Sequence, residues 1–225
     1  KLRRLLMPNK WSYSSLSLFQ QCPKKYYHLR IAKDVDDPPS QQIKYGLEVH
    51  KAAEDYVRDG KELPLYLGYI KPMLDALLRK QGEKFAEQKL GLTADLEPCS
   101  FHDKNVWWRG IADLTILNPP EARVLDYKTG KSQYADVKQL EILALAIFKH
   151  YPEVEVVKAG LLFVVHKDFI KADYDRAKEA ELWNYWRSET SRLDSAYAND
   201  VWNPKQNFTC RAWCPVVECV HNGKR

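Results

Sequence analysis

Two aspartates and a lysine in the middle of the chain have the types and spacing of a hydrolytic metal site. Asp126 and Lys128 are two residues apart at the end of the apolar segment Arg123-Val124-Leu125, and side chains two apart on a strand project from the same face. Asp113 comes earlier, and the Asn118-Pro119-Pro120 turn between them would fold two strands into a hairpin that brings the aspartates together. Two adjacent carboxylates predict a site for a hard divalent cation, Mg²⁺ or Mn²⁺.

The chemistry that suits these residues is phosphodiester hydrolysis. That reaction needs a water activated near neutral pH and neutralisation of the charge on the phosphate, and divalent metal ions supply both. Lys128 could position the water or stabilise the developing charge. An isolated Asp-x-Lys is more often a solvated strand end, so the interpretation depends on what surrounds it.

The elements that must hold these residues follow from apolar periodicity and turn signals. Segments with β-branched and aromatic residues, bounded by turn residues, predict strands at 106–117, 123–128 and 154–165. Apolar residues at three- and four-residue spacing predict helices from near Ser14 to before Pro23, and at 46–57, 69–90, 134–150 and 172–197. A sheet in the middle of the chain, covered by the long helix 134–150, is the expected core.

The composition is that of an ordinary globular protein. The chain has 225 residues, of which 45% are hydrophobic and 29% charged, which excludes a disordered or low-complexity class. We expect one domain, 1–225, with a mainly helical part at 1–95, the catalytic sheet and helix core at 96–170, and a C-terminal helix with a cysteine-rich end at 171–225.

The charge and hydropathy pattern is compatible with a polyanionic partner. The net charge is +5, a mild basic bias. No apolar stretch is long enough to span a membrane, and the basic stretch 1–6 is too short for a secretory signal. We expect a soluble, cytoplasmic protein without membrane contact, acting at the nucleoid or in a phage-infected cell.

Five short motifs follow one another in an order that resembles a known family. They are Ser14-Ser15-Leu16 through Cys22-Pro23-Lys24-Lys25-Tyr26-Tyr27, Gly46-Leu47-Glu48-Val49-His50, Gly110-Ile111-Ala112-Asp113, Asp126-Tyr127-Lys128-Thr129-Gly130 and Gln139-Leu140. Across residues 11–220 the sequence resembles the RecB-like branch of the PD-(D/E)XK nuclease superfamily, with its AddB-type and CRISPR-adaptation-type iron–sulfur exonucleases. The resemblance implies an α/β fold with a restriction-endonuclease-like core, a central mixed sheet flanked by helices, and helical N-terminal and cysteine-bearing C-terminal additions.

The resemblance also implies a role for each motif residue. The metal ligands would be His50, Asp113, Asp126 and the backbone carbonyl of Tyr127. Lys128 would be the catalytic lysine, and Gln139 would hold DNA or orient that lysine from the long helix. The family often has a tyrosine four residues after this glutamine, where this chain has Leu143, so one DNA contact is not carried over. A histidine beside an apolar helical stripe is usually a packed residue, so the role of His50 rests on the motif order; as a ligand it would shift metal preference from Mg²⁺ toward Mn²⁺.

Four of the five cysteines are placed like the ligands of a metal cluster. An odd number of cysteines, three of them crowded near the C-terminus, favours a metal or cluster site over a disulfide framework. The resemblance implies a [4Fe-4S] cluster held by Cys22, Cys210, Cys214 and Cys219, although the last three read C-x3-C-x4-C instead of the commoner C-x2-C-x5-C. Zn²⁺ on the same thiolates and buried free cysteines are the alternatives.

A basic segment interleaved with aromatic residues is the candidate DNA-contacting surface. Its members are Lys24, Lys25, Tyr26, Tyr27 and Arg30. Lysines and arginines suit phosphate contacts, and tyrosines can stack on unpaired bases. An amphipathic helix with packed tyrosines and solvated lysines explains the same pattern, and the sequence does not decide between the two.

The leading functional hypothesis is a metal-dependent DNA exonuclease or end-processing nuclease in replication, recombination or repair. Its substrate would be DNA with single-stranded character or free ends. No Gly-x-x-x-x-Gly-Lys-Ser/Thr motif occurs, so a helicase or recombination partner would be a separate protein. A restriction-type endonuclease is disfavoured by the helical His50 motif. The other alternative is a catalytically degenerate DNA-binding or structural module of a larger helicase–nuclease or recombination complex.

Overall fold

A computed structural model describes residues 9–224, so the basic stretch 1–6 lies outside the described residues. The chain divides into two compact units. The larger is Pro39–Trp183, and the smaller combines Lys1–Pro38 with Asn184–Arg225. Every element of the Asp113 and Asp126 site belongs to the larger unit.

The larger unit is built on a mixed sheet, which confirms the expected α/β fold with a central mixed sheet flanked by helices. Within the described residues six strands pair in the order β2-β1-β3-β4-β5-β6. They are β1 (Glu83–Leu92), β2 (Pro98–Cys99), β3 (Trp108–Asn118), β4 (Glu121–Lys128), β5 (Val156–Phe163) and β6 (Asp168–Asp175). β4 and β5 are parallel, and the other neighbours are antiparallel.

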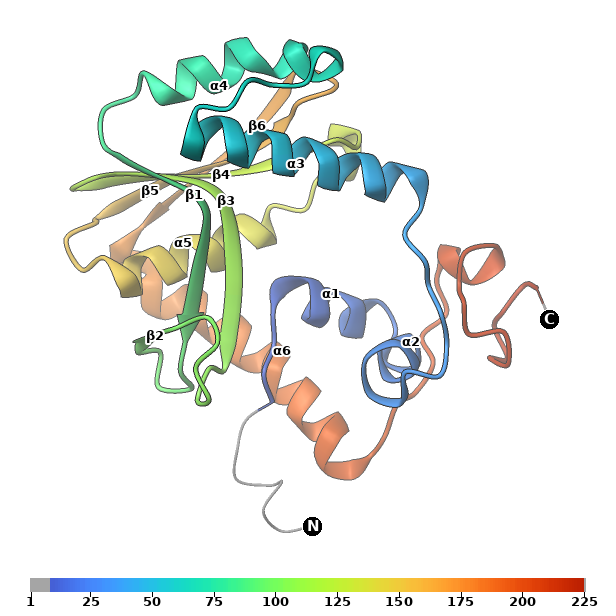
Figure 1. Cartoon of the computed structure of the whole chain (residues 1–225). Coiled ribbons are helices and arrows are strands. Elements are labelled where there is room, and N and C mark those ends of the chain that lie inside the picture. The colour runs from blue at the N-terminus through green and yellow to red at the C-terminus, as the bar shows by residue number, and fades with distance from the viewer. Residues whose placement is uncertain (1–8, 225) are drawn as a thin grey trace. The chain divides into compact units, whose positions relative to one another are not determined.

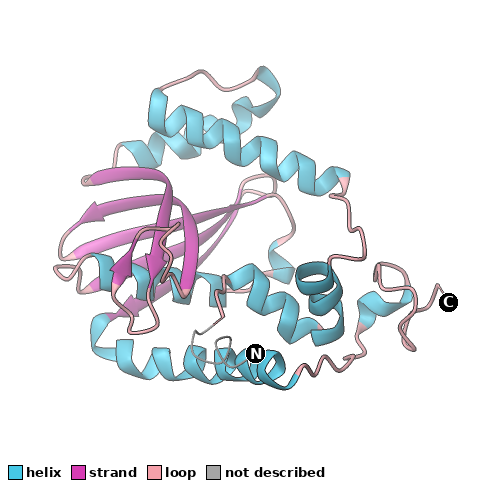
Figure 2. Cartoon of the chain, turned by 60° about the horizontal axis from the view of Figure 1, so that its bottom comes forward, coloured by secondary structure: helices cyan, strands magenta, loops and turns pink. Residues whose placement is uncertain are grey.

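Helices cover both faces of this sheet (Figures 1 and 2). One face carries α3 (Gln41–Asp59), the 3-10 helix η3 (Leu65–Ile70) and α4 (Lys71–Leu78), and the other carries α5 (Lys138–His150). Short 3-10 helices, η4 (Ser132–Tyr134) and η5 (Arg176–Lys178), lie in the connections. α5 is the crossover between β4 and β5, because two parallel strands cannot be joined by a tight turn.

α3 is defined by a cap at each end and a buried stripe between them. The Ser40 side chain accepts a hydrogen bond from the Ile43 backbone N–H, and Gly60 ends the helix with a left-handed φ of 66°, where glycine avoids the Cβ penalty. Val49 and Ala53 are 0% and 1% exposed and pack in a core with residues of β3, β4 and α4. The predicted helix 46–57 is confirmed.

The predicted helix 69–90 is wrong beyond Leu78. Gly82 turns the chain at a φ of 114°, and β1 begins at Glu83 and pairs with β3 along its whole length. The apolar spacing that predicted a helix is real only as far as α4. The local sequence does not predict β1, because this strand is stabilised by pairing with β3, about twenty residues further along the chain.

The predicted helix 172–197 is wrong at its start. Ala172 lies in β6, and α6 (Glu179–Asn199) begins only after η5. β6 is an edge strand whose residues alternate between exposed and half-buried. Charged side chains on such an edge guard against pairing with other chains, but they also remove the apolar alternation that would predict a strand. The helix predicted at 134–150 likewise begins later, at Lys138.

The expected hairpin of β3 and β4 is confirmed. The two strands are antiparallel with Leu114 opposite Leu125, and one further step in that register sets Asp113 against Asp126. Residues directly opposite each other in an antiparallel pair project from the same face. The hairpin therefore brings the two aspartates to one point, as the turn at 118–120 predicted.

The smaller unit is helical and joins segments from both ends of the described chain. It contains α1 (Tyr13–Gln21), α2 (Pro23–Tyr26), the π-helix η2 (Tyr27–Ala32), the later part of α6 and the 3-10 helix η6 (Phe208–Arg211). A Ser12–Ser15 capping box starts α1, and the helix stops before Pro23, as predicted. Trp11 stacks on Trp186 of α6 with ring centroids 5.6 Å apart.

None of the helices in residues 9–224 combines the length and apolar character needed to cross a membrane.

Gly82 should be essential for the turn that leads into β1. A Cβ at this position would lie 2.4 Å from the Leu117 carbonyl oxygen, and φ is 114°, so Gly82→Ala should lower the free energy of unfolding by more than about 2 kcal/mol. Gly68→Ala is the matched control, because a Cβ there meets nothing within 4 Å, and should change it by less than about 1 kcal/mol. Urea unfolding of the purified variants measures both. Equal stability of the two variants would contradict the assignment of this turn.

Candidate active site

His50 reaches from α3 to the middle of β3 and the end of β4. Its Nδ1 lies 3.2 Å from Asp113 Oδ1, and its Nε2 lies 2.8 Å from the Tyr127 carbonyl oxygen. A carboxylate and a carbonyl only accept hydrogen bonds, so both ring nitrogens must carry protons when no metal is bound. The pKa agrees with this geometry: burial lowers it, but the hydrogen bond and charge of Asp113 outweigh burial and raise the pKa of His50 to about 9.

Asp113 connects three elements through one carboxylate. Its Oδ1 faces His50 of α3, and its Oδ2 accepts a hydrogen bond of 2.6 Å from the Tyr127 backbone N–H of β4. The side chain is buried, at 7% exposure. A buried carboxylate must be paired or hydrogen-bonded to be tolerated, and here those partners are the very groups that surround the candidate metal position.

Asp126, Lys128 and Gln139 form a closed triangle. The Lys128 ammonium is 2.6 Å from Asp126 Oδ2 and donates a 2.8 Å hydrogen bond to Gln139 Oε1. The Gln139 amide in turn donates a 2.5 Å hydrogen bond to Asp126 Oδ1. Burial, and after it the charge of Asp113, raises the pKa of Asp126, while the charge of Lys128 opposes the rise. Gln139, from the first turn of α5, thus contacts both the lysine and the aspartate.

Glu87 is a site residue that the sequence prediction missed. It lies in β1 between pairs that set Ala86 against Leu114 and Gln88 against Ala112, so the register sets it against Asp113. Its φ is 51°, a left-handed backbone that costs free energy in a non-glycine residue and is often found at functional sites. Burial, and then the charge of Asp113, raises the pKa of Glu87 to about 7. A strand prediction at 83–92 would have found it.

The donor set at this point suits a hard divalent cation. Single ligand atoms of His50, Glu87 and Asp113 lie within 4.8 Å of one another, a group that does not include Asp126 among the described residues. Asp126 Oδ2 is buried, and no described residue donates a hydrogen bond of standard geometry to it. It forms an ion pair with the Lys128 ammonium. Carboxylate oxygens with one imidazole fit Mg²⁺ or Mn²⁺ and do not fit soft metals.

These groups open into a cleft of about 510 Å³, within the range of ligand-binding pockets. Its lining is half charged and half apolar and consists of Ile43, Gly46, Leu47, His50, Lys51, Glu54, Glu87, Ile111 and Asp113. A Cβ on Gly46 would lie 3.3 Å from Thr129 Oγ1. The glycine therefore lets α3 approach the turn that follows Lys128, which brings His50 within reach of β4.

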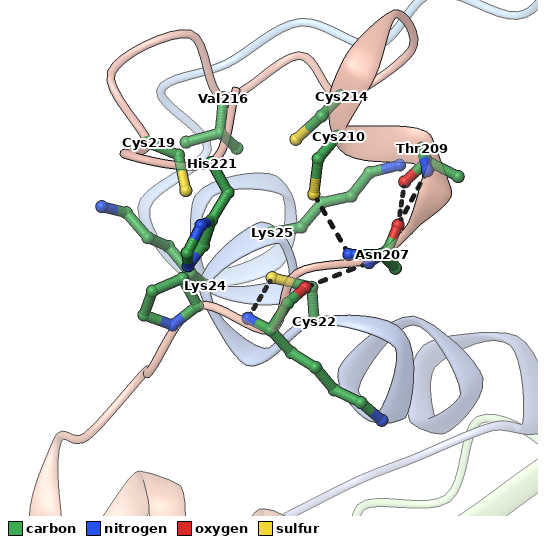
Figure 3. A pocket seen from close by; sticks show the side chains of 12 residues that line it. Cys22, Lys24, Lys25, Asn207, Thr209, Cys210, Cys214, Val216, Cys219 and His221 are labelled. Atoms are coloured by element: carbon green, nitrogen blue, oxygen red, sulfur yellow. Dashed lines mark hydrogen bonds between the residues drawn. The ribbon is translucent and has the colours of Figure 1, made fainter. Parts of the chain in front are cut away.

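The four cysteines of the predicted cluster line one pocket in the smaller unit. Figure 3 shows the sulfur atoms of Cys22, Cys210, Cys214 and Cys219 facing a common space, and all four side chains are buried. Cys22 Sγ accepts a 3.4 Å hydrogen bond from the Lys205 backbone N–H, and Cys210 Sγ accepts a 3.5 Å bond from that of Asn207.

The four thiols do not form a close ligand group in this structure. No three of the sulfur atoms come within 4.8 Å of one another among the described residues. No cysteine is in a disulfide.

The basic aromatic segment separates into packed and accessible residues. Tyr26 is 3% exposed; its hydroxyl contacts that of Tyr197 at 3.0 Å, and its ring stacks on Trp202. Lys24 and Lys25 line the cysteine pocket, but the Lys25 side chain is only 13% exposed and lies 3.9 Å from Asp37, whereas Arg30 is exposed. Because the Tyr26 ring is buried among protein side chains, base stacking is left to other residues.

The comparisons with known proteins concern the family and the fold. The sequence model of the PD-(D/E)XK nuclease superfamily matches residues 10–219. No curated protein matches the sequence. Among solved structures, a protein from Eubacterium rectale named "Putative exonuclease" is similar with a TM-score of 0.50 and 11% identity, over 90% of this chain and 86% of that one. SSO0001 is similar with a TM-score of 0.45 and 14% identity, over 95% of this chain and 87% of that one. At such identities the likeness to the first protein concerns the fold alone.

Binding of Mn²⁺ should displace the His50 proton. Because the pKa of His50 is about 9 in the folded protein and 6.5 when unperturbed, its contacts stabilise the metal-free fold fully below pH 6.5, and this contribution is lost as pH rises through about 9. Between about pH 7 and pH 9, Mn²⁺ affinity should rise by up to about tenfold per pH unit. Calorimetry in buffers of different ionisation enthalpy should detect about one proton released per ion at pH 8.

The control for this measurement is His50→Gln. At pH 8 Glu87, with a pKa of about 7, is mostly ionised already, so the variant should release much less than one proton. An affinity that does not change between pH 6.5 and 8.5 in the unsubstituted protein would contradict the protonated state of His50.

Proposed function

Because the chain belongs to the PD-(D/E)XK nuclease superfamily, we propose that it is a divalent-metal-dependent deoxyribonuclease that hydrolyses phosphodiester bonds. The observation that carries this proposal is the convergence of acids and bases on one cleft. Asp113 and Glu87 lie with His50 at its wall, and the Asp126–Lys128 pair is adjoining, since Tyr127 between them contacts both Asp113 and His50.

The metal would be held by groups from four elements. Its ligands would be His50, Asp113, Asp126 and the backbone carbonyl of Tyr127, with Glu87 as a further ligand. A bound Mg²⁺ or Mn²⁺ would neutralise phosphate charge and lower the pKa of a bound water.

Lys128 is the residue that would meet the reacting phosphate. Its side chain is 34% exposed, whereas Asp126 beside it is 4% exposed, so the ammonium is anchored on the inner side and open on the outer. An ammonium there can hold the attacking water or stabilise charge that develops on the phosphate. Gln139 would act as a positioning residue, because its amide fixes both Lys128 and Asp126.

An exonuclease or end-processing role in replication, recombination or repair is the finer form of the proposal. It rests on the order of motifs from Ser14 to Gln139, which is that of the RecB-like branch. A helicase or recombination protein would then supply the unwound ends. The alternative, a degenerate DNA-binding or structural module, is disfavoured because His50, Asp113, Asp126 and Lys128 are all present. His50 contacts Asp113 and Lys128 contacts Asp126, and the Tyr127 backbone contacts the first pair.

We also propose that Cys22, Cys210, Cys214 and Cys219 hold a [4Fe-4S] cluster. The support is one pocket lined by all four thiols and backbone N–H groups directed at two of them. Such a cluster would join the chain's N-terminal and C-terminal segments and so stabilise the smaller unit. We also propose phosphate contacts for Lys24, Lys25 and Arg30. The two lysines line the cysteine pocket, and Arg30 follows them in the sequence.

Loss of the catalytic groups should stop cleavage without unfolding the protein. Asp126→Asn and Lys128→Met should each lower the rate at least about a hundredfold, because they remove a ligand charge or the ammonium while nearly preserving side-chain volume. Lys104→Met, at an exposed turn residue, is the matched control and should cleave normally. Rates are measured on end-labelled DNA, with circular dichroism to verify folding; normal turnover by Asp126→Asn would sink the assignment.

The mode of cleavage is tested with linear and circular DNA, single- and double-stranded, in Mg²⁺, Mn²⁺, Ca²⁺ or EDTA. We expect linear single strands to be degraded and circles to survive. Ca²⁺ should support binding but not efficient cutting, since its larger, looser shell positions water badly. Full activity in excess EDTA excludes a metal-dependent enzyme, and rapid cutting of circles excludes an exonuclease.

Protein purified without oxygen should be brown and contain about four iron and four sulfide per chain, as the cluster requires. Cys214→Ser should lose the visible absorbance, whereas Cys99→Ser, which changes a half-buried cysteine of β2 outside the pocket, should keep it. Stoichiometric zinc, or neither metal in anaerobic protein, would refute the cluster.

A further inference from the structure

The wall of the cleft opposite its carboxylates on β1 and β3 carries exposed apolar side chains that the proposed chemistry does not use. Ile43 and Leu47 are 56% and 64% exposed, and both line the cleft together with His50 and Glu54. Positions 43, 47, 50 and 54 are four, three and four residues apart, so they form one stripe along α3. The stripe is apolar in its first half and polar in its second.

The apolar half continues on the sheet. Ile111 also lines the cleft and lies two residues before Asp113 in β3, so both side chains project from the same face of that strand. Exposed apolar residues scattered singly need no explanation, but several that gather in a cleft beside polar groups mark a ligand-binding groove.

The position of this apolar wall is fixed. Val49 and Ala53, on a neighbouring face of α3, are buried in the core, and the close approach of Gly46 to Thr129 sets α3 against the end of β4. The Tyr66 hydroxyl reaches Glu48 on the same helix. Ile43 and Leu47 are therefore presented at a constant distance from the metal-binding groups.

The nucleic-acid group that matches this surface is an unpaired base. In a duplex the faces of the bases are covered by their neighbours, and only their edges are accessible in the grooves. An unpaired base has a free face that packs on apolar side chains, and leucine and isoleucine are among the residues that separate stacked bases by insertion.

We propose that Ile43, Leu47 and Ile111 form a subsite for one unpaired nucleobase, next to the Asp113 and Glu87 carboxylates, where a bound divalent cation would hold the phosphodiester. The inference rests on the proposed nuclease function and adds to it the residues that would select a strand that is single or locally melted where it is cut. The apolar side chains and the carboxylates line the same cleft. Along a nucleic-acid strand each base lies beside a phosphate, so one strand could place a base on the apolar wall and the adjoining phosphate near the carboxylates.

The test is a binding experiment that does not depend on cleavage. Variants are made in the Lys128→Met background, and affinities for a single-stranded 20-mer and the matching blunt duplex are measured by fluorescence anisotropy in Ca²⁺. Ile43→Ala with Leu47→Ala should weaken single-strand binding about fivefold to tenfold, with less than a twofold change for the duplex. Leu47→Met, similar in volume and apolarity, should retain the affinity. Leu65→Ala, at a 99% exposed leucine outside the cleft, is the control.

A scan of the DNA locates the subsite. One abasic site is moved along the single strand; at one position it should weaken binding by the same factor, and the Ile43 and Leu47 double variant should be insensitive to it there. An equal loss on single strand and duplex, no loss, or indifference to every abasic position would overturn the proposal. So would a change of oligomeric state in the double variant, because it would identify a second copy of the chain as the occupant.

Failure of this proposal is distinguishable from failure of the nuclease function. If the unsubstituted protein cuts DNA but ignores abasic sites, only the subsite is refuted. If it binds single strands with the expected abasic signature but cuts nothing, only the catalytic assignment is refuted.

Discussion

The site depends on one buried carboxylate. Asp113 accepts a hydrogen bond from the Tyr127 backbone N–H and faces the His50 imidazole, so it ties α3, β3 and β4 together at a single point. A backbone donor fixes the position of the chain and not only that of a side chain. Because Tyr127 separates Asp126 from Lys128, holding its N–H also sets the position of both neighbours. Without Asp113, the contacts that join α3, β3 and β4 at this point would be lost, and the other site residues would no longer be held in position.

The concentration of negative charge explains the pattern of partners. Burial, and after it the charge of the nearby Asp113, raises the pKa of both Glu87 and Asp126. Without a metal, His50 and Lys128 supply the compensating positive charge. Buried charges of one sign are tolerated only with such compensation. A bound divalent cation would relieve this repulsion, and its charge would lower the raised pKa values of the carboxyl groups. The arrangement therefore suits a metal ion, and the repulsion destabilises the site when no metal is bound.

Local sequence was enough for some of this site and not for the rest. Asp126 and Lys128 share a short strand, and the Pro-Pro turn sets the hairpin, so their approach to Asp113 followed from local rules. Glu87 did not, because β1 is stabilised by its long pairing with β3 and its residues 83–92 carry no clean alternation. β6 was not predicted for a different reason: it is an exposed edge strand with charged side chains. In both cases partners distant in sequence decide the structure, and intrinsic strand propensity cannot report them.

The two candidate sites also differ in what assembles them. His50, Glu87, Asp113 and Asp126 come from α3, β1, β3 and β4, elements that must pack anyway to bury the core shared by α3 and the sheet. The hydrolytic site is therefore formed by the same burial that folds the larger unit. The same packing compensates for the strain of the left-handed backbone at Glu87. Cys22 and Cys210 to Cys219 come from segments far apart in the sequence, and closing so long a loop has an entropic cost. Buried aromatic contacts between the same segments, Trp11 on Trp186 and Tyr26 on Trp202, oppose that cost, so the cysteine pocket is assembled by the packing of the smaller unit.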